Sequence, residues 1–291
     1  MKNIIRLMRP GQWVKNLFVF LPMFFNGSMT NAEYWQASLW AFVVFCLASS
    51  AVYCLNDLCD AEFDRQHPSK RNRPIASGAV GKGTAVALMI FLAAFAVALS
   101  ILVFGISWPL LIVVLYLLLN VLYTLKLKQI AIVDVITLSF GFVLRVLMGG
   151  LACHIVLSEW IIVMTFLLSL FLAVAKRRDD VIVYNTDGAL TRKSVSGYSL
   201  KLINQILSML SSVIIVAYLM YTLSPDTMAR FGSEYIYTTA IFVIAGILRY
   251  LQLANGDGKT GSPTAIFLHD RFIQVCVLGW VILFSLFIYV R

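Results

Sequence analysis

Long apolar stretches recur along this 291-residue chain, and short polar segments separate them. A stretch of roughly 17 to 25 apolar residues crosses a hydrocarbon core of about 30 Å as an α-helix. Eight stretches approach that length and a shorter one precedes them; they cover residues 17–28, 39–55, 84–104, 109–125, 130–150, 160–175, 203–223, 235–253 and 272–290. They lack the polar and apolar alternation of barrel strands, so they predict membrane-spanning helices.

The first stretch gives the weakest prediction, because Pro22 interrupts it and Asn26-Gly27 ends it early. A cleaved signal peptide over residues 1–30 is the alternative, but no small-residue cleavage site follows the basic start. We therefore predict an all-α polytopic membrane protein, a single domain over residues 1–291. Nine transmembrane helices would surround a central cavity that is open to the cytoplasmic side.

Composition and charge agree with this class. The chain is 60% hydrophobic and 13% charged, which leaves too little polar surface for an ordinary soluble domain. Of its 23 Lys and Arg residues, all but Arg145, Arg230 and Arg291 fall in the N-terminal segment or in loops expected on the same side. Cytoplasmic loops hold such an excess of positive charge. The protein is therefore expected in the inner membrane, with its N-terminus on the cytoplasmic side. The positive charge does not indicate nucleic-acid binding, because the sequence predicts no soluble domain that could bind a nucleic acid.

Two charged loops, residues 56–83 and 176–202, follow the second and sixth stretches. They are four helices apart. Their spacing suggests two four-helix halves, each of which delivers a charged loop to a shared cavity, with the ninth helix as an addition.

The first loop begins with an acidic cluster. Asp57, Asp60 and Asp64 stand at i, i+3 and i+7, so a continuing helix is expected to place them on one face, with the amide oxygen of Asn56 beside them. Such carboxylates repel one another unless a cation is present, and oxygen ligands select a hard ion such as Mg²⁺. A solvated acidic helix end is the alternative, but charge at a membrane boundary is costly and usually functional. The cluster predicts Mg²⁺ and a phosphorylated ligand.

Cations follow the acidic cluster. Lys70 and Arg73 are the expected diphosphate contacts, and Asp179 is a candidate further metal ligand. Phosphate groups favour the planar fork of arginine, although any one of these cations is also explained as a positive-inside charge. Arg145 lies within a predicted helix and needs a partner, either substrate or structural. The other candidate substrate-binding residues are Lys15, Asn16, Lys126, Lys128, Arg145, Lys176, Arg177, Arg178 and Tyr198.

These motifs carry a family resemblance. The pattern Asn56-Asp57-x-x-Asp60-x-x-x-Asp64 after a second helix, with another charged loop after the sixth, resembles the UbiA-type intramembrane prenyltransferase superfamily over essentially the whole chain. Within it, the decaprenyl-phosphate phosphoribosyltransferase branch is most similar, on Arg9-Pro-x-Gln-Trp-x-Lys-Asn16, His67-Pro-x-Lys-x-x-Arg-Pro-Ile75, Gly141-Phe-Val-Leu-Arg145 and Ala175-Lys-Arg-Arg178. The Asp-x-x-x-Asp pattern of aromatic prenyltransferases is missing from the second loop.

The resemblance implies a Mg²⁺-dependent transfer of 5-phosphoribosyl from phosphoribosyl diphosphate to a polyprenyl phosphate, with release of diphosphate. The main alternative is an aromatic prenyltransferase that moves a prenyl chain from its diphosphate onto a hydroxybenzoate- or quinone-type acceptor. A lipid-binding or transport protein is a second alternative, although its acidic residues should lie near the bilayer midplane. The sequence leaves open whether the protein forms an oligomer.

Overall fold

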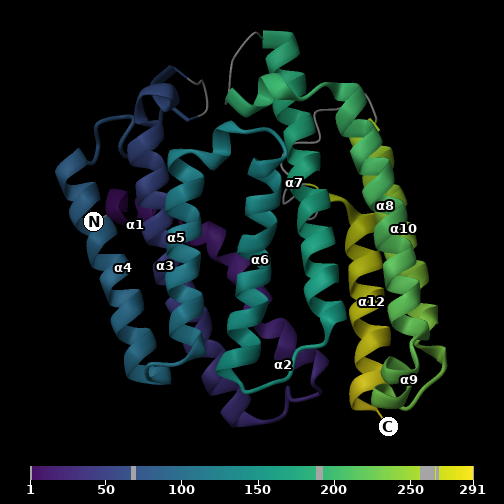
Figure 1. Ribbon diagram of the computed structural model, residues 1–291. Helices are drawn as coiled ribbons and strands as arrows, with labels where there is room; N and C mark the ends of the chain where they lie inside the picture. The colour runs from purple at the N-terminus through teal and green to yellow at the C-terminus, as the bar shows by residue number, and fades with distance from the viewer. Residues whose placement is uncertain (1, 67–69, 188–192, 256–265, 267–268, 291) are drawn as a thin grey trace. The chain divides into compact units, whose positions relative to one another are not determined.

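The computed structural model of the chain describes residues 2–66, 70–187, 193–255, 266 and 269–290. It divides into two compact units, Met1–Ser158 and Glu159–Arg291. All regular structure in the described residues is helical (Figure 1), which confirms the predicted all-α class. His67 and Pro68 of the first loop lie outside the described residues.

The first unit contains four long helices and several short ones. The long helices are α3 (Ala32–Gln66), α4 (Lys82–Phe104), α5 (Trp108–Leu125) and α6 (Val133–Ala152). The short ones are α1 (Lys2–Met8), the 3₁₀ helix η1 (Pro10–Phe20), α2 (Leu21–Phe25) and the 3₁₀ helix η2 (Leu127–Gln129).

Eight helices in the described part of the chain are long and apolar enough to cross a membrane, so the protein is a multi-pass membrane protein. The first apolar stretch does not form one long α-helix. Pro10 and Pro22 stand at the starts of η1 and α2, and a proline lacks the N–H that a continuous helix needs. The predicted number of nine spans is therefore approximate.

Helices α3 and α6 form the interior of the first unit. In their most apolar windows 61% of residues are buried, against 17% in α4. Phe45 of α3 packs with Tyr116 of α5 and Met148 of α6 in a core that also includes Val19 of η1. Gly149 allows η1 to approach α6 closely, since a Cβ at this position would lie 1.9 Å from the carbonyl oxygen of Val19.

The second unit contains α7 (Glu159–Asp187), η3 (Lys193–Gly197), α8 (Leu200–Leu223), α9 (Pro225–Phe231), η4 (Tyr235–Thr239), α10 (Ala240–Asn255) and α12 (Arg271–Tyr289). Within it α7 packs on α8, α8 on α10, and α10 on α12. Each unit thus has four long helices, as the loop spacing suggested. The additional apolar stretch belongs to the N-terminal unit, however, and not to the C-terminus as expected.

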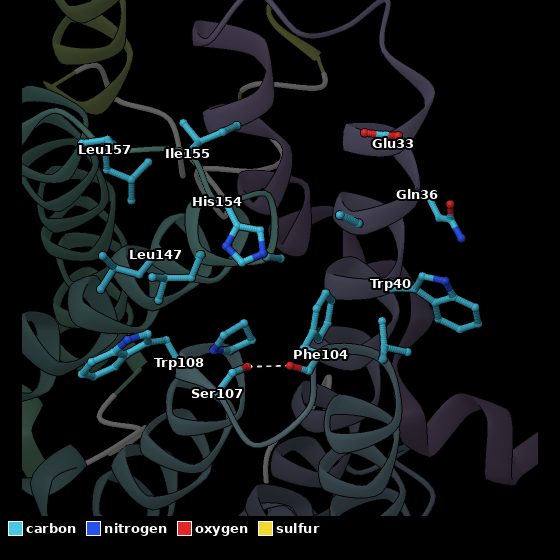
Figure 2. A pocket seen from close by; sticks show the side chains of 17 residues that line it. Glu33, Gln36, Trp40, Phe104, Ser107, Trp108, Leu147, His154, Ile155 and Leu157 are labelled. Atoms are coloured by element: carbon cyan, nitrogen blue, oxygen red, sulfur yellow. Dashed lines mark hydrogen bonds between the residues drawn. The ribbon is translucent and has the colours of Figure 1, made fainter.

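A cavity of about 800 Å³ lies at the N-terminal end of α3 (Figure 2). Trp40, Phe104 and Trp108 form part of its apolar wall, while Glu33 and His154 supply polar groups. The acidic motif occupies the other end of the 35-residue helix α3. This cavity is therefore separate from the predicted catalytic region.

Candidate active site

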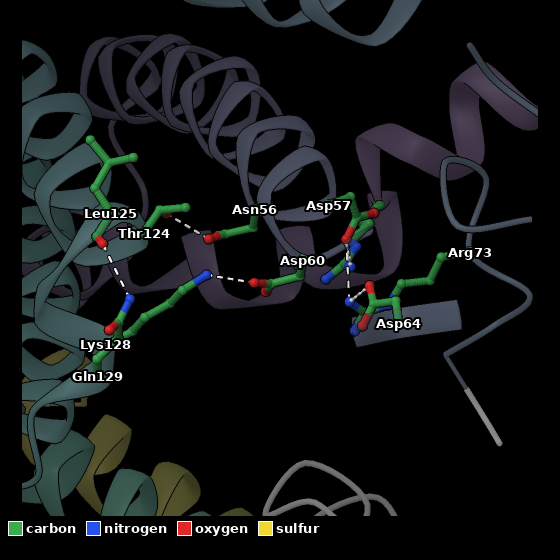
Figure 3. Close-up of polar contacts among 10 residues, drawn as sticks. Asn56, Asp57, Asp60, Asp64, Arg73, Thr124, Leu125, Lys128 and Gln129 are labelled. Atoms are coloured by element: carbon green, nitrogen blue, oxygen red, sulfur yellow. Dashed lines mark hydrogen bonds and ion pairs between the residues drawn. The ribbon is translucent and has the colours of Figure 1, made fainter. Parts of the chain in front are cut away.

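The C-terminal end of α3 carries the acidic motif, whose side chains contact two different groups of partners (Figure 3). Asp57 and Asp64 contact one guanidinium, that of Arg73. Asn56 and Asp60 are one turn apart. Asn56 contacts Thr124 at the C-terminal end of α5, and Asp60 contacts Lys128 of η2. Residues at i, i+3 and i+7 of an α-helix share a face, so the three carboxylates lie on one face of α3 and contact cations on two sides of it.

Asp57 is the most deeply buried of the three carboxylates, with 1% of its side chain exposed. Its Oδ1 accepts hydrogen bonds from Arg9 and from Arg73 Nη1, the latter at 3.3 Å. Arg73 also donates to Asp64 Oδ2 at 2.6 Å. Among the described residues, Asp57 Oδ2 is buried and has no hydrogen-bond partner. A buried carboxylate oxygen without a donor is costly, so this atom is available to a ligand.

The other group of contacts joins α3 to the end of α5 and to η2. Lys128 Nζ contacts Asp60 Oδ1 at 2.6 Å, and Asp60 keeps 29% of its side chain exposed. Thr124 donates to the side-chain oxygen of Asn56, also at 2.6 Å. Lys128 thus lies next to the acidic motif, although 68 residues separate it from Asp60 in the sequence; its substrate-binding role remains a prediction.

Every carboxylate of the motif has a cationic partner. In the part of the chain that the structure describes, no three acidic, histidine or cysteine side chains are grouped closely enough to hold a metal ion. Arg9, Arg73 and Lys128 relieve the repulsion that we expected a metal ion to relieve. The donor set still suits Mg²⁺, because it consists of carboxylate and amide oxygens and includes the unpartnered Asp57 Oδ2.

Asn16 and Arg145 come together inside the first unit. Both are buried. Arg145 Nε donates to Asn16 Oδ1 at 2.8 Å, and its other nitrogens donate to the Gly141 carbonyl oxygen at 2.7 Å and to the Tyr116 hydroxyl at 3.0 Å. The guanidinium also lies 4.9 Å from the centre of the Tyr116 ring. Arg145 therefore has the structural partners that its position within a helix requires.

The remaining first-unit candidates differ in exposure. Lys126 is exposed at the end of α5, whereas Lys15 and Lys70 are half-buried. Their role as substrate contacts remains a prediction.

The second charged loop begins inside α7, in the other unit. Arg177 is 2% exposed and forms an ion pair with Asp180 one turn later. Arg178 Nε donates to Asn204 Oδ1 of α8 at 3.0 Å. Lys176 is exposed and Asp179 is half-buried, while Tyr198 is buried. Their substrate-binding and metal-binding roles also remain predictions.

Sequence reasoning did not select Arg9 as a site residue. Arg9 stands between α1 and η1 with φ 53°, and its guanidinium lies 5.3 Å from the centre of the Tyr53 ring. Ser50 of α3 donates to the Met8 carbonyl oxygen and accepts from Trp13, which fixes this junction on α3. Arg9 opens the Arg9-Pro-x-Gln-Trp-x-Lys-Asn16 motif, but only the fold places its guanidinium on Asp57.

The chain is similar to known proteins over most of its length. The chain matches the model of the UbiA prenyltransferase family over residues 17–289. It is 35% identical to a decaprenyl-phosphate phosphoribosyltransferase of Mycolicibacterium smegmatis, across 96% of this chain and 90% of that protein. It is 34% identical to the protein of that name from Corynebacterium glutamicum, across 99% of this chain and 87% of the other.

A solved structure shows the same fold. A UbiA homologue from Archaeoglobus fulgidus, bound to DMAPP and Mg²⁺, superimposes with a TM-score of 0.73 at 18% identity over 98% of each chain. The family match supports an enzyme of the transferase class over the transport or lipid-binding alternative. It also confirms the resemblance that the motifs carry: the chain belongs to the UbiA prenyltransferase family.

Proposed function

We propose that this protein transfers 5-phosphoribosyl from phosphoribosyl diphosphate to a polyprenyl phosphate and releases diphosphate. The observation that carries the proposal is a sequence identity of 34–35%, over nearly the full chain, to two proteins named decaprenyl-phosphate phosphoribosyltransferase. The acidic motif with its adjacent cations supports a diphosphate leaving group at the end of α3.

Asp57, Asp60, Asp64 and Asn56 would hold Mg²⁺, with Asp57 Oδ2 as the oxygen that is already free of other partners. When bound, such an ion supplies positive charge to the oxygens of a departing diphosphate. Arg73 contacts Asp64, and Lys128 contacts Asp60. Lys70 begins the turn that leads to Arg73. These three cations would bind and orient the diphosphate.

The acceptor needs no general base, because the phosphate oxygen of a polyprenyl phosphate is already anionic. Asn16, Lys15, Lys126 and Arg145 of the first unit are further proposed substrate contacts. In the second unit Lys176, Arg177, Arg178 and Tyr198 would bind the other phosphorylated substrate, and Asp179 would be an additional metal ligand. Arginine and lysine at these positions suit an anionic acceptor.

We place the protein in the inner membrane, with its N-terminus and active site on the cytoplasmic side. The asymmetric distribution of lysine and arginine supports this orientation. We treat residues 1–291 as one domain, built from the two compact units.

The test compares two reactions of the purified full-length protein with Mg²⁺. One contains phosphoribosyl diphosphate and decaprenyl phosphate, the other geranyl diphosphate and 4-hydroxybenzoate, and released diphosphate is measured in both. We expect turnover in the first reaction only. Turnover in the second alone would overturn the proposal and establish prenyl transfer, the chemistry suggested by the prenyl diphosphate in the A. fulgidus homologue.

A further inference from the structure

Each carboxylate of the acidic motif already has a cation of the protein against it. Three carboxylates, those of Asp57, Asp60 and Asp64, stand in ion pairs with three cations, those of Arg9, Arg73 and Lys128. A divalent cation that entered this set alone would leave an uncompensated charge in a largely buried place, which is unfavourable. A diphosphate that entered alone would meet the same carboxylates and be repelled.

The two arginines are the cations placed most directly on the buried part of the set. Both reach Asp57 Oδ1, the atom adjacent to the unpartnered Oδ2. Arg9 and Arg73 keep 24% and 29% of their side chains exposed, whereas Asp57 is almost completely covered. An incoming ligand can therefore reach the two guanidinium groups, whereas the Asp57 carboxylate is covered.

Arg9 is also held in place by features that do not involve the carboxylates. Its backbone has a positive φ, which is uncommon for a residue with a side chain. The Ser50 hydroxyl binds the Met8 carbonyl oxygen at 3.0 Å, and the Tyr53 ring lies under the guanidinium. Arg9 thus reaches the site from a separate segment, which it ties to α3.

We propose, on the basis of the proposed function, that Arg9 and Arg73 act as resident counter-ions that couple the binding of the divalent metal ion to the binding of diphosphate. Without diphosphate, the arginines occupy the carboxylates and weaken metal binding. When diphosphate arrives, the planar guanidinium forks bind its oxygens and release Asp57 and Asp64 to the metal ion. Arg9 is in this account a diphosphate-binding residue, a role that the sequence analysis expected of Lys70 and Arg73.

The coupling has a thermodynamic consequence. If diphosphate raises the affinity for the metal ion by some factor, the metal ion raises the affinity for diphosphate by the same factor. Removal of one guanidinium should reduce this coupling factor, and two binding measurements should show the change. It should strengthen binding of the metal ion alone, because a competing cation has gone, and weaken retention of diphosphate in the presence of the metal ion.

The experiment uses the full chain in lipid nanodiscs and Mn²⁺ as the metal probe. Binding of Mn²⁺ alone is followed by electron paramagnetic resonance, and retention of radiolabelled inorganic diphosphate at saturating Mn²⁺ by equilibrium dialysis. For Arg9→Gln we expect Mn²⁺ alone to bind about tenfold more tightly than to the wild type, and diphosphate about tenfold more weakly, in keeping with the coupling of close charge pairs.

Arg9→Lys, which keeps the charge but loses the planar fork, should bind Mn²⁺ alone about as the wild type does and should retain diphosphate more weakly. Arg6→Gln is the matched control, since Arg6 is exposed on the neighbouring α1 and should leave both unchanged. If Arg9→Gln does not fold, Arg73→Gln carries the same expectation, because Arg73 contacts Asp57 and Asp64.

Equal or weaker binding of Mn²⁺ alone to the folded glutamine variant would overturn the counter-ion role while leaving the proposed function standing. Failure of the wild type to retain diphosphate even with Mn²⁺ would be a different result, because it would remove the diphosphate site itself and with it the proposed function.

Discussion

At the scale of single residues, the site is defined by which cation each carboxylate contacts. Asp57 and Asp64 share Arg73, Asp57 also contacts Arg9, and Asp60 contacts Lys128. The burial of Asp57 makes these contacts strong, because a buried carboxylate has little water to solvate it. Asp57 is therefore the residue on which the local charge arrangement depends most.

Asp57→Asn should reduce transferase activity by about 100-fold or more, the size of effect expected when a group that stabilises developing charge is lost. A neutral amide neither attracts a divalent cation nor balances Arg9 and Arg73. The measurement is kcat/KM for phosphoribosyl diphosphate at saturating acceptor. Glu62→Gln is the control, because Glu62 is exposed on the same helix, and it should retain wild-type activity. Similar activities for the two variants would exclude a role for Asp57.

Some residue contacts were beyond prediction from the sequence. The spacing of Asp57, Asp60 and Asp64 indicated a polar helix end, and that is where the structure has them. The partners of these residues come from distant segments: Lys128 is 68 positions from Asp60, and Asn16 is 129 positions from Arg145. A lysine that pairs with a site residue and one that only faces the membrane surface look the same in a sequence, so only tertiary packing distinguishes them.

At the scale of secondary-structure elements, the packing of η1 against α6 positions the N-terminal segment that supplies Arg9. This contact depends on Gly149, whose missing Cβ leaves room for the carbonyl oxygen of Val19. Prolines divide the segment into η1 and α2, which is why the first apolar stretch did not become a single helix.

Gly149→Ala should destabilise the protein by about 1–3 kcal/mol, the usual cost of overpacking, because its Cβ would overlap backbone atoms that cannot rotate away. Thermal unfolding in detergent measures this as a lower Tm. Gly141→Ala is a control in the same helix, since a Cβ there would make ordinary contacts of 3.6 Å and longer. Equal Tm values for the two variants would contradict the close packing of η1 on α6.

The start of α12 provides a test by pH. Asp270 accepts a hydrogen bond from the Ile273 backbone and pairs with Arg249 at 2.8 Å. The Arg249 contact lowers the pKa of Asp270 below its ordinary value. This contribution to stability is therefore complete above the carboxyl's unfolded pKa and is lost as the pH falls through the lower, folded pKa.

Asp270→Asn keeps a good helix-capping residue but removes the charge. The wild type should lose more Tm than this variant when the pH is lowered from about 6 to about 3, the range in which carboxylates titrate. Parallel pH profiles for the two proteins would mean that the Asp270–Arg249 pair does not contribute to stability.

At the scale of the whole molecule, apolar stretch length predicted the fold class well, because a bilayer imposes one helix length on every span. The eight spans of the described residues overlap the predicted stretches, although Ala32–Arg65 and Glu159–Asn185 extend well beyond the predicted 39–55 and 160–175. The boundary between the two units was harder to predict. It follows α6, one helix later than the loop spacing suggested, because the short N-terminal helices pack with α3 and with α6.

The most direct test of the whole account is the mass of the lipid product. Purified protein in nanodiscs is incubated with phosphoribosyl diphosphate, decaprenyl phosphate and Mg²⁺, and the extracted lipid is analysed by mass spectrometry. The account predicts decaprenyl phosphate enlarged by one phosphoribosyl group in the wild-type reaction, and unchanged lipid with EDTA or with Asp57→Asn. Unmodified lipid in the wild-type reaction, or equal product from Asp57→Asn, would contradict it.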